Sequence, residues 1–363
     1  MNRAAKAICL ILVFCLLLGS GCWSRREMEG LAYILVMGID KTETGHIRLV
    51  AQVGLPAQQE GDSPTIHVLT AEGRDISEAI DVLFGQTTKY PILSHMRLVI
   101  FSENLAKDGI RQVMDFIRRD IRVRLNVKVA VSSDDLEELL GLETPLSSQP
   151  ALALIDLFNF NAQRSRVARV EAMDLVAMLL EPDLEAYLPR VSKGEDTYKL
   201  GETVIFAGDR MVGELDRNLT PGLLFLQNRV RGGVFTVPCG RSGYATTKVL
   251  SSRTRVHTLW EEERLRVIVE VTVNGMLIEL VCNQDEQAAL EDALAHYIIN
   301  RIDDVIQLAQ EHRTDFIGFS FRFRRDHPQI WQQVHGRWAD VLADADFDLR
   351  CRVTLLRQGQ TPR

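Results

Sequence analysis

Motifs for metal and nucleotide binding are absent from this sequence, and cysteine is sparse. Its 363 residues contain only six cysteines, and no CxxC or Cys/His spacing typical of a metal site occurs. There is also no GxSxG elbow, no GxxxxGK[ST] or GxGxxG phosphate fingerprint and no HExxH zinc motif. No apolar run reaches the roughly 20 residues that a transmembrane helix needs. The sequence therefore predicts no bound metal, no cofactor and no membrane-spanning helix of its own.

The composition is that of an ordinary globular protein. Hydrophobic residues make up 46% of the chain and charged residues 25%, which leaves no room for extensive disorder. At about 100 to 200 residues per domain, this length predicts two or three domains.

The first residues have the pattern of an export signal. Arg3 and Lys6 supply positive charge, and an apolar stretch too short to span a bilayer follows at 7–18. The string LLLGSGC then resembles the lipobox that lipoprotein signal peptidase reads. We therefore expect residues 1–21 to be a lipoprotein signal peptide and Cys22 to carry fatty acyl chains such as palmitate. The alternative is a plain secretory signal that leaves Cys22 unmodified.

The chain is acidic. Its formal charge is −7, and loss of Arg3 and Lys6 with the signal peptide makes it −9, because the first acidic residue is Glu27. An acidic ectodomain is not expected to bind nucleic acid, and as a whole it is repelled by an anionic lipid surface. The lipid and protein partners must therefore hold it at a membrane.

Three cysteines remain in the part of the chain that is expected to fold, namely Cys239, Cys282 and Cys351. A disulfide scaffold would use an even and denser set. We therefore interpret them as small buried hydrophobic residues, with room for one disulfide pair.

Hydrophobic periodicity in the first half predicts a sheet with helices packed on it. The apolar run 31–39 and the alternating run 46–55, joined by KTETG, predict a hairpin. A strand, a helix, a strand, a helix, a strand and a helix then follow in that order. We expect them at 64–70, 75–88, 95–101, 109–119, 125–131 and 134–141, with two more helices at 151–160 and 171–180.

The second half has an antiparallel pattern. Alternation at 265–273 predicts a strand, and Asn274-Gly275 predicts a type I′ turn before the chain returns at 276–281. A long helix is expected at 285–312, because apolar residues recur there at spacings of three or four. Further strands are expected at 199–207, 210–214 and 347–355, and a further helix at 328–342.

Charge, proline and glycine are concentrated at 181–199, which places the best domain boundary near residue 190. We expect an N-terminal mixed α/β domain at 22–190 and a C-terminal domain of antiparallel sheet and long helices at 191–363. The predicted fold class is α+β, a multi-domain, lipid-anchored ectodomain of mixed and antiparallel sheets with packed helices.

Side chains of the kinds used in catalysis do not converge. Ser94 and His95 are a nucleophile next to a base, but as neighbours on a strand they are expected to point to opposite faces. His327 and His335 have no metal-ligand spacing and are expected at the surface or at helix ends. We therefore predict that the chain is not an enzyme.

Two acidic clusters and two tryptophans also need an interpretation. The carboxylates at 134–138 and 261–263 could form a glycosidase pair, but their place on loops and helix starts favours solvated charge. Trp331 and Trp338 share one helical face, which places both in the core or in a partner interface, with the core favoured.

Five strings carry a resemblance that spans nearly the whole mature chain. They are GCWSRREMEGLAYILVMGID at 21–40, SHMRLVIFSENLAKDGI at 94–110, FIRRDIRVR at 116–124, GETVIFAGDRMVGELDRNLTPGLLFL at 201–226 and DFIGFSFRFRRDHPQIWQQVHGRWAD at 315–340. Together they resemble the C-subunit lipoproteins of spore germination receptors, the GerAC family. The chain departs from the family's pattern before Gly222, where an acidic residue and an arginine are usual, so a partner contact at this turn stays open.

The resemblance implies a lipid-anchored ectodomain on the outer face of the cell membrane, which in the spore is the inner membrane. It implies assembly with two multispanning receptor subunits, the A-type and the B-type, which sense nutrients and release ions. It also implies a role without catalysis, cofactor or nucleic acid. The residues agree, because a lipid-anchored chain without an assembled catalytic site is expected to act by binding and positioning.

Two other classes of lipoprotein were considered. A solute-binding lipoprotein of a membrane transporter is usually built from alternating βα units around parallel sheets, whereas the second half here is rich in hairpins. A cell-wall hydrolase needs convergent acid and base residues, which this sequence does not assemble.

Overall fold

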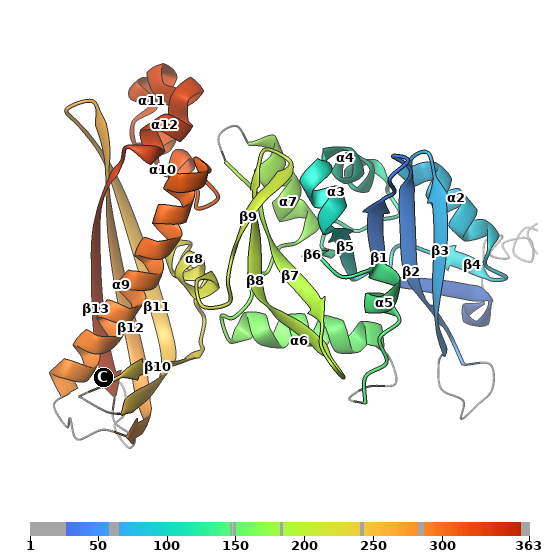
Figure 1. Cartoon of the computed structure of the whole chain (residues 1–363), viewed down its shortest axis with the longest axis horizontal. Coiled ribbons are helices and arrows are strands. Elements are labelled where there is room, and N and C mark those ends of the chain that lie inside the picture. Colours follow the sequence, from blue (N-terminus) through green and yellow to red (C-terminus); the bar gives the residue numbers. More distant parts are fainter. Residues whose placement is uncertain are drawn as a thin grey trace, which may run out of the picture.

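The computed structural model describes residues 27–57, 65–145, 147, 150–181, 184–239, 243–281 and 287–356. The predicted signal peptide and Cys22 therefore lie outside the described residues. The molecule is elongated, with one sheet towards each end of its long axis (Figure 1). The predicted α+β class, with mixed and antiparallel pairing in two sheets and packed helices, is confirmed.

The first sheet is mixed. Its strand order is β3-β2-β1-β5-β6-β7-β8-β9, and β4 pairs with β1 in addition. Pairing is parallel from β1 through β5 and β6 to β7, and antiparallel on both sides of that centre. The strands are β1 (Leu31–Lys41), β2 (Ile47–Leu55), β3 (Thr65–Gly73), β4 (Tyr90–Ile92), β5 (Leu98–Ser102), β6 (Lys128–Ser132), β7 (Tyr187–Lys193), β8 (Tyr198–Ala207) and β9 (Arg210–Leu215).

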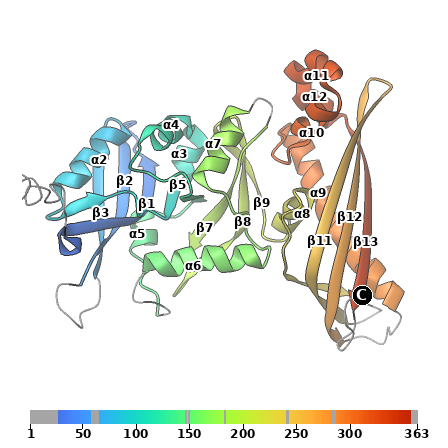
Figure 2. The ribbon, with the colours of Figure 1, turned by 180° about the vertical axis from the view of Figure 1, so that it is seen from behind.

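Helices cover both faces of this sheet (Figures 1 and 2). In β5, Val99 and Phe101 pack into one apolar cluster while Leu98 and Ile100 pack into the other. Because both faces are buried, the strand is a continuous hydrophobic run instead of an alternating one. The helices are α2 (Ile76–Gly85), α3 (Glu103–Asp108), α4 (Arg111–Arg119) and α7 (Ala172–Leu180) on one face, and α5 (Leu136–Leu140) and α6 (Pro150–Gln163) on the other.

The second sheet has the order β10-β11-β12-β13, and the last pair is parallel. The helix α9 lies along one face of it, close to the predicted range, and its predicted stripe is buried from Leu290 to Val305. The strands are β10 (Val234–Pro238), β11 (Tyr244–Glu261), β12 (Arg264–Val281) and β13 (Asp346–Leu356). The helices are α8 (Thr220–Leu226), α9 (Gln287–His312), α10 (Phe319–Asp326), α11 (Pro328–Val334) and α12 (Trp338–Ala343), with 3-10 turns η1 (Met28–Gly30) and η2 (His335–Arg337).

The type I′ turn predicted at Asn274-Gly275 is wrong. β12 runs straight through these residues, and the hairpin turn lies at Glu262 and Glu263, which adopt φ values of 50° and 61°. Gly275 is needed for packing, because a Cβ atom there would lie 2.6 Å from Cγ2 of Thr247. A glycine in a strand often marks such a close approach, and the turn signal was therefore misread.

One further prediction differs from the structure. The single helix expected at 328–342 is divided into α11 and α12 by η2. The predicted boundary at residue 190 falls inside β7, which pairs with β6 on one side and β8 on the other. The first sheet therefore continues to Leu215, and the chain passes to the second sheet between Leu215 and Val234.

Glycine lets α8 approach α9 closely. Residues 220–226 are all buried, and a Cβ atom on Gly222 would lie 2.8 Å from the carbonyl carbon of Arg301 and closer still to its oxygen. The turn considered as a partner contact is therefore a buried helix–helix contact inside the protein.

We expect Gly222→Ala to destabilise the protein by up to about 2 kcal/mol. The added methyl group meets backbone that has to move as a unit, which costs about 1–3 kcal/mol. This cost outweighs the gain of about 1 kcal/mol in helix propensity that alanine offers over glycine. Chemical unfolding of the full chain measures the difference. Gly336→Ala is the matched control, because a Cβ atom there has no neighbour within 4 Å, and an equal loss in both variants would contradict the packing argument.

Candidate functional site at the junction of the two sheets

A buried tyrosine connects the two sheets. Tyr187 of β7 is 3% exposed, and its hydroxyl donates to Oε1 of Gln227 at 2.8 Å and accepts from Nη1 of Arg229 at 2.9 Å. Gln227 in turn donates through Nε2 to the carbonyl oxygen of Phe316 at 3.2 Å. Burial raises the pKa of Tyr187, so its hydroxyl stays protonated and keeps its donor role. These contacts join β7, the segment after α8 and the segment before α10.

Asp315 organises the side of the junction that belongs to the second sheet. Its carboxylate is buried and accepts hydrogen bonds from the backbone N–H groups of 318–320 and from Nε1 of Trp338 at 3.0 Å. Its backbone oxygen accepts from the N–H of Glu185 at 3.2 Å. One carboxylate thereby fixes the start of α10, while the same residue's backbone contacts the first sheet.

The apolar core is continuous across the junction. A single cluster of buried side chains includes Val99 of β5, Phe225 of α8 and Val267 of β12. Trp331 and Trp338 belong to the same cluster, with exposed fractions of 9% and 3% and ring centroids 5.2 Å apart. The prediction that both tryptophans are core residues is confirmed.

A polar cavity of about 830 Å³ opens beside this junction. Its polar lining residues are Asn159, Gln163, Arg169, Glu171, Asp174, Arg229 and Arg231. The acidic residues have structural partners, since Glu171 pairs with Arg169, and Asp174 accepts from the backbone N–H of Glu171 at the start of α7. Among the described residues, three arginines and no nucleophile line the cavity, so the chemistry of this lining suits the binding of an anionic group.

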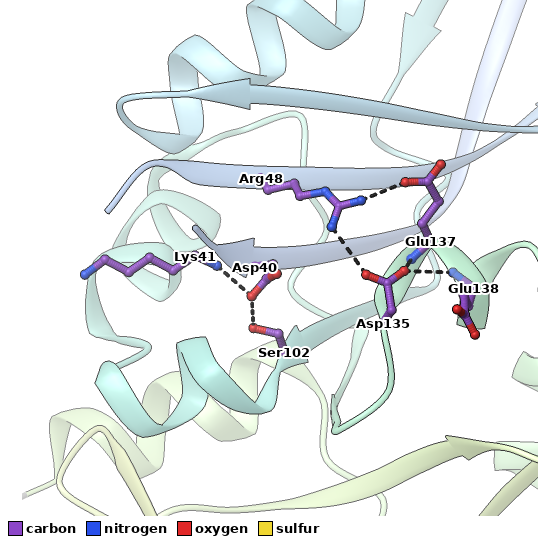
Figure 3. A network of polar contacts seen from close by, with 7 residues as sticks. All are labelled: Asp40, Lys41, Arg48, Ser102, Asp135, Glu137 and Glu138. Carbon is purple, nitrogen blue, oxygen red and sulfur yellow. Dashed lines mark hydrogen bonds and ion pairs between the residues drawn. The ribbon is translucent and has the colours of Figure 1, made fainter. Parts of the chain in front are cut away.

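A second set of charges lies at the carboxyl edge of the first sheet (Figure 3). Asp40 at the end of β1 accepts hydrogen bonds from the hydroxyl of Ser102 and from the N–H of Lys41. Arg48 of β2 reaches Asp135 at 3.3 Å and Glu137 at 2.7 Å. These contacts fasten the start of α5 to the sheet.

The carboxylates considered as a glycosidase pair are used in the same way. Asp135 accepts from the N–H groups of Glu138 and Glu137, and these bonds, together with Arg48, hold the pKa of Asp135 below its usual value. Asp134 accepts from the N–H of Lys193, whose ammonium pairs with Glu138. A carboxyl group stabilised in its charged form does not act as a general acid near neutral pH.

The histidine predictions had mixed outcomes. Ser94 and His95 lie in a turn before β5 and not on a strand, so the argument from opposite faces was wrong, and Oγ of Ser94 lies 3.4 Å from Nδ1 of His95. The His95 ring packs edge-on against Tyr33, with no orienting carboxylate bonded to it in the described ranges. His327 lies at a helix end, as expected. In the part of the chain that the structure describes, no group of three or more His, Cys, Asp or Glu residues is arranged to hold a metal ion.

Two of the three predicted core cysteines, Cys239 and Cys351, differ in their bonding, and Cys282 lies outside the described residues. Cys239 is disulfide-bonded, whereas Cys351 is free and half-buried. Burial raises the pKa of the Cys351 thiol to about 12, so it is almost entirely un-ionised and poorly nucleophilic at neutral pH.

Among the described residues, no helix combines the length and apolar character needed to cross a bilayer.

Sequence reasoning missed the junction. Tyr187 lies in the charge-rich stretch that was interpreted as a domain boundary, although the apolar residues of AYLPRVS did carry a strand signal. Gln227 and Arg229 follow a helix that was predicted as a turn. No local pattern predicts that three residues so far apart in sequence meet, because that contact depends on how the sheets pack.

We expect Tyr187→Phe to lower the free energy of unfolding by about 1 kcal/mol, since it removes two hydrogen bonds at a buried hydroxyl. Urea unfolding of the full chain measures the effect. Tyr244→Phe is the matched control, because the hydroxyl of Tyr244 is exposed and makes a long 3.4 Å contact with Glu279. The control is expected to change stability by less than about 0.5 kcal/mol, and equal effects at the two sites would contradict a structural role for the junction.

Comparison with known proteins places this fold in a family. The model for "Spore germination protein N-terminal domain" matches residues 24–193, and the model for "Spore germination B3/ GerAC like, C-terminal" matches residues 201–359. The two matches divide the chain close to the boundary predicted from composition, although the first sheet runs across that point.

Full-length relatives give the same result. Spore germination protein KC of Bacillus subtilis strain 168 is 24% identical, covering 97% of this chain and 96% of the relative. Spore germination protein B3 of the same strain is 22% identical, covering 93% and 94%. The crystal structure of the GerBC protein superposes with a TM-score of 0.60 at 18% identity, covering 88% of this chain and 96% of that one, so the fold is shared. The chain belongs to the GerAC family of spore germination proteins.

Proposed function

We propose that this protein is the lipid-anchored C-type subunit of a nutrient germinant receptor, assembled with an A-type and a B-type multispanning subunit. The observation that carries the proposal is the match of both family models over almost all of the chain, in the order expected for the family. Relatives of the same length bear the names of spore germination proteins. The two proposed domains are 22–190 and 191–363, joined through β7.

The proposed anchor is a lipid on Cys22, following a signal peptide at 1–21. The string LLLGSGC supports it. Each buried methylene contributes about 0.8 kcal/mol, and two acyl chains hold a protein at a membrane where one gives only reversible attachment. The protein would then lie on the outer face of the cell membrane, which is the inner membrane of the spore.

The role that we propose is binding and positioning, without catalysis. The carboxylates considered for catalysis are engaged as helix caps and ion pairs. The junction cavity presents arginines without a nucleophile. The mainly antiparallel second sheet with a long helix across it also differs from the βα units usual in a solute-binding lipoprotein, which is the alternative function.

We expect Cys22→Ala to remove the protein from the membrane fraction of sporulating cells and to reduce the recovery of its partners. The tagged chain would be purified from detergent-solubilised membranes, and the co-purified proteins and the mass of the N-terminal peptide would be determined. Cys351→Ala, which changes the free thiol of β13, is the matched control and should behave as the parent chain does.

Two multispanning partners with the parent and the control, and few with Cys22→Ala, are the expected result. Purification of the parent alone, or together with a transporter permease, would contradict the receptor proposal and favour the solute-binding alternative. An unmodified Cys22 would contradict the anchor, whatever partners are recovered.

A further inference from the structure

We call the edge at which the parallel strands of the first sheet begin its amino edge, and β1, the first of these strands, follows Cys22 in the sequence. β1, β4, β5 and β6 are parallel, so their first residues lie towards one edge. β1 extends furthest, and its first residue, Leu31, pairs with Tyr90 of β4. In Figure 1, β4 and α2 (blue) lie at one end of the long axis, and the second sheet lies at the other.

An apolar side chain projects from this edge into solvent. Ile121, in the segment between α4 and β6, is 99% exposed, whereas Val123 two residues later is 8% exposed. Tyr90 is itself 51% exposed. The fold thus uses Val123 for its core and leaves Ile121 without a packing role among the described residues.

Arg122, the residue after Ile121, has two partners. Its guanidinium lies over the ring of Phe84, 5.6 Å from the centroid, and pairs with Asp120 at 2.6 Å. Phe84 belongs to the last turn of α2, a few residues before β4. The exposed isoleucine is therefore held close to the start of β4, and so close to the start of β1.

The segment around Ile121 is basic although the chain as a whole is acidic. Residues 116–124 contain four arginines and one aspartate, a net charge of +3, against −7 for the whole sequence. Arg118 and Arg119 pair with Asp115, and Arg124 makes no ion pair within the described ranges. The acidic side chains before β1, Glu27 and Glu29, are exposed and offset part of this charge.

The chain between the proposed lipid and the sheet is short. Nine residue steps separate Cys22 from Leu31, and at about 3.3–3.6 Å per residue they span at most about 32 Å. A lipid on Cys22 thus keeps the amino edge near the bilayer, while the far sheet is free to point away from it.

We propose that this amino edge docks on an anionic lipid bilayer, with Ile121 and Tyr90 in the interfacial layer and the arginines of 118–124 at the headgroups. The proposal rests on the lipid anchor proposed above. Such an edge is stabilised at an anionic bilayer in two ways: the apolar side chain leaves water for the interfacial layer, and the arginines are attracted to the anionic headgroups. The overall negative charge repels the rest of the molecule from the same surface, so this edge faces the membrane and the second sheet projects away from it.

A fluorescent probe at position 121 tests the orientation. The Ile121→Cys variant of the full lipoprotein would be labelled with an environment-sensitive dye and reconstituted into vesicles containing phosphatidylglycerol, or phosphatidylcholine alone. Leu250→Cys is the matched control, because Leu250 is an exposed aliphatic residue of β11, 42% exposed in the second sheet. Cys351 is half-buried with a raised pKa, so it competes little for the dye, and the labelled parent chain measures this background.

We expect a blue shift and a gain in emission at position 121, quenching by lipids with a nitroxide high on the acyl chain, and a stronger response in the anionic vesicles. No response is expected at position 250. Equal responses at the two positions, or none at 121 while mass spectrometry shows lipid on Cys22, would overturn the docking proposal and leave the anchor intact. An unmodified Cys22 would overturn the anchor and, with it, the proposal.

Discussion

The hydroxyl of Tyr187 lies between Gln227 and Arg229, at the place where the two sheets of the protein meet. It connects a strand of the first sheet to the segment that leads into the second, at a place where the apolar core is also continuous. A buried hydroxyl with both of its hydrogen bonds satisfied contributes little in net energy, but it is costly to leave unpaired. We infer that these hydrogen bonds and the continuous core together hold the two sheets in one relative arrangement.

The constraint matters for the proposed role of a subunit that acts by position. The proposed lipid would hold only the start of the chain, so the rest would reach a partner in a defined place only if the sheets move together. The buried carboxylate of Asp315, which fixes the start of α10 and binds Trp338, supports the same arrangement from the second sheet. A subunit that acts by assembly therefore requires a stiff junction more than it requires a reactive group.

Local patterns in the sequence were enough to predict most elements. The run LVIF in β5 is continuous because both faces of that strand are buried. The apolar residues of α9 form a stripe because only one face of that helix is buried. The Asn274-Gly275 turn failed because a glycine that serves packing looks the same in sequence as a glycine that serves a turn. The junction was not predictable, since Tyr187, Gln227 and Phe316 meet only after both sheets have formed. Cys22 was predicted from a processing signal, to which the fold contributes nothing.

The chain shares its fold with relatives whose sequences are only 18–24% identical to it. A core tolerates many substitutions when volume and pattern are kept, so a TM-score of 0.60 at 18% identity is not surprising.

We propose that the two sheets form one rigid body, which the proposed anchor positions at the membrane. The distance between the sheets can be measured in the full lipoprotein by pulsed electron–electron double resonance. The spin labels would be attached at Asp81→Cys on α2 and Arg255→Cys on β11, which are both exposed sites. We expect one narrow distribution of distances between the two labels, the same in detergent and in vesicles. A broad or two-peaked distribution would contradict this proposal, because it would show that the sheets move independently.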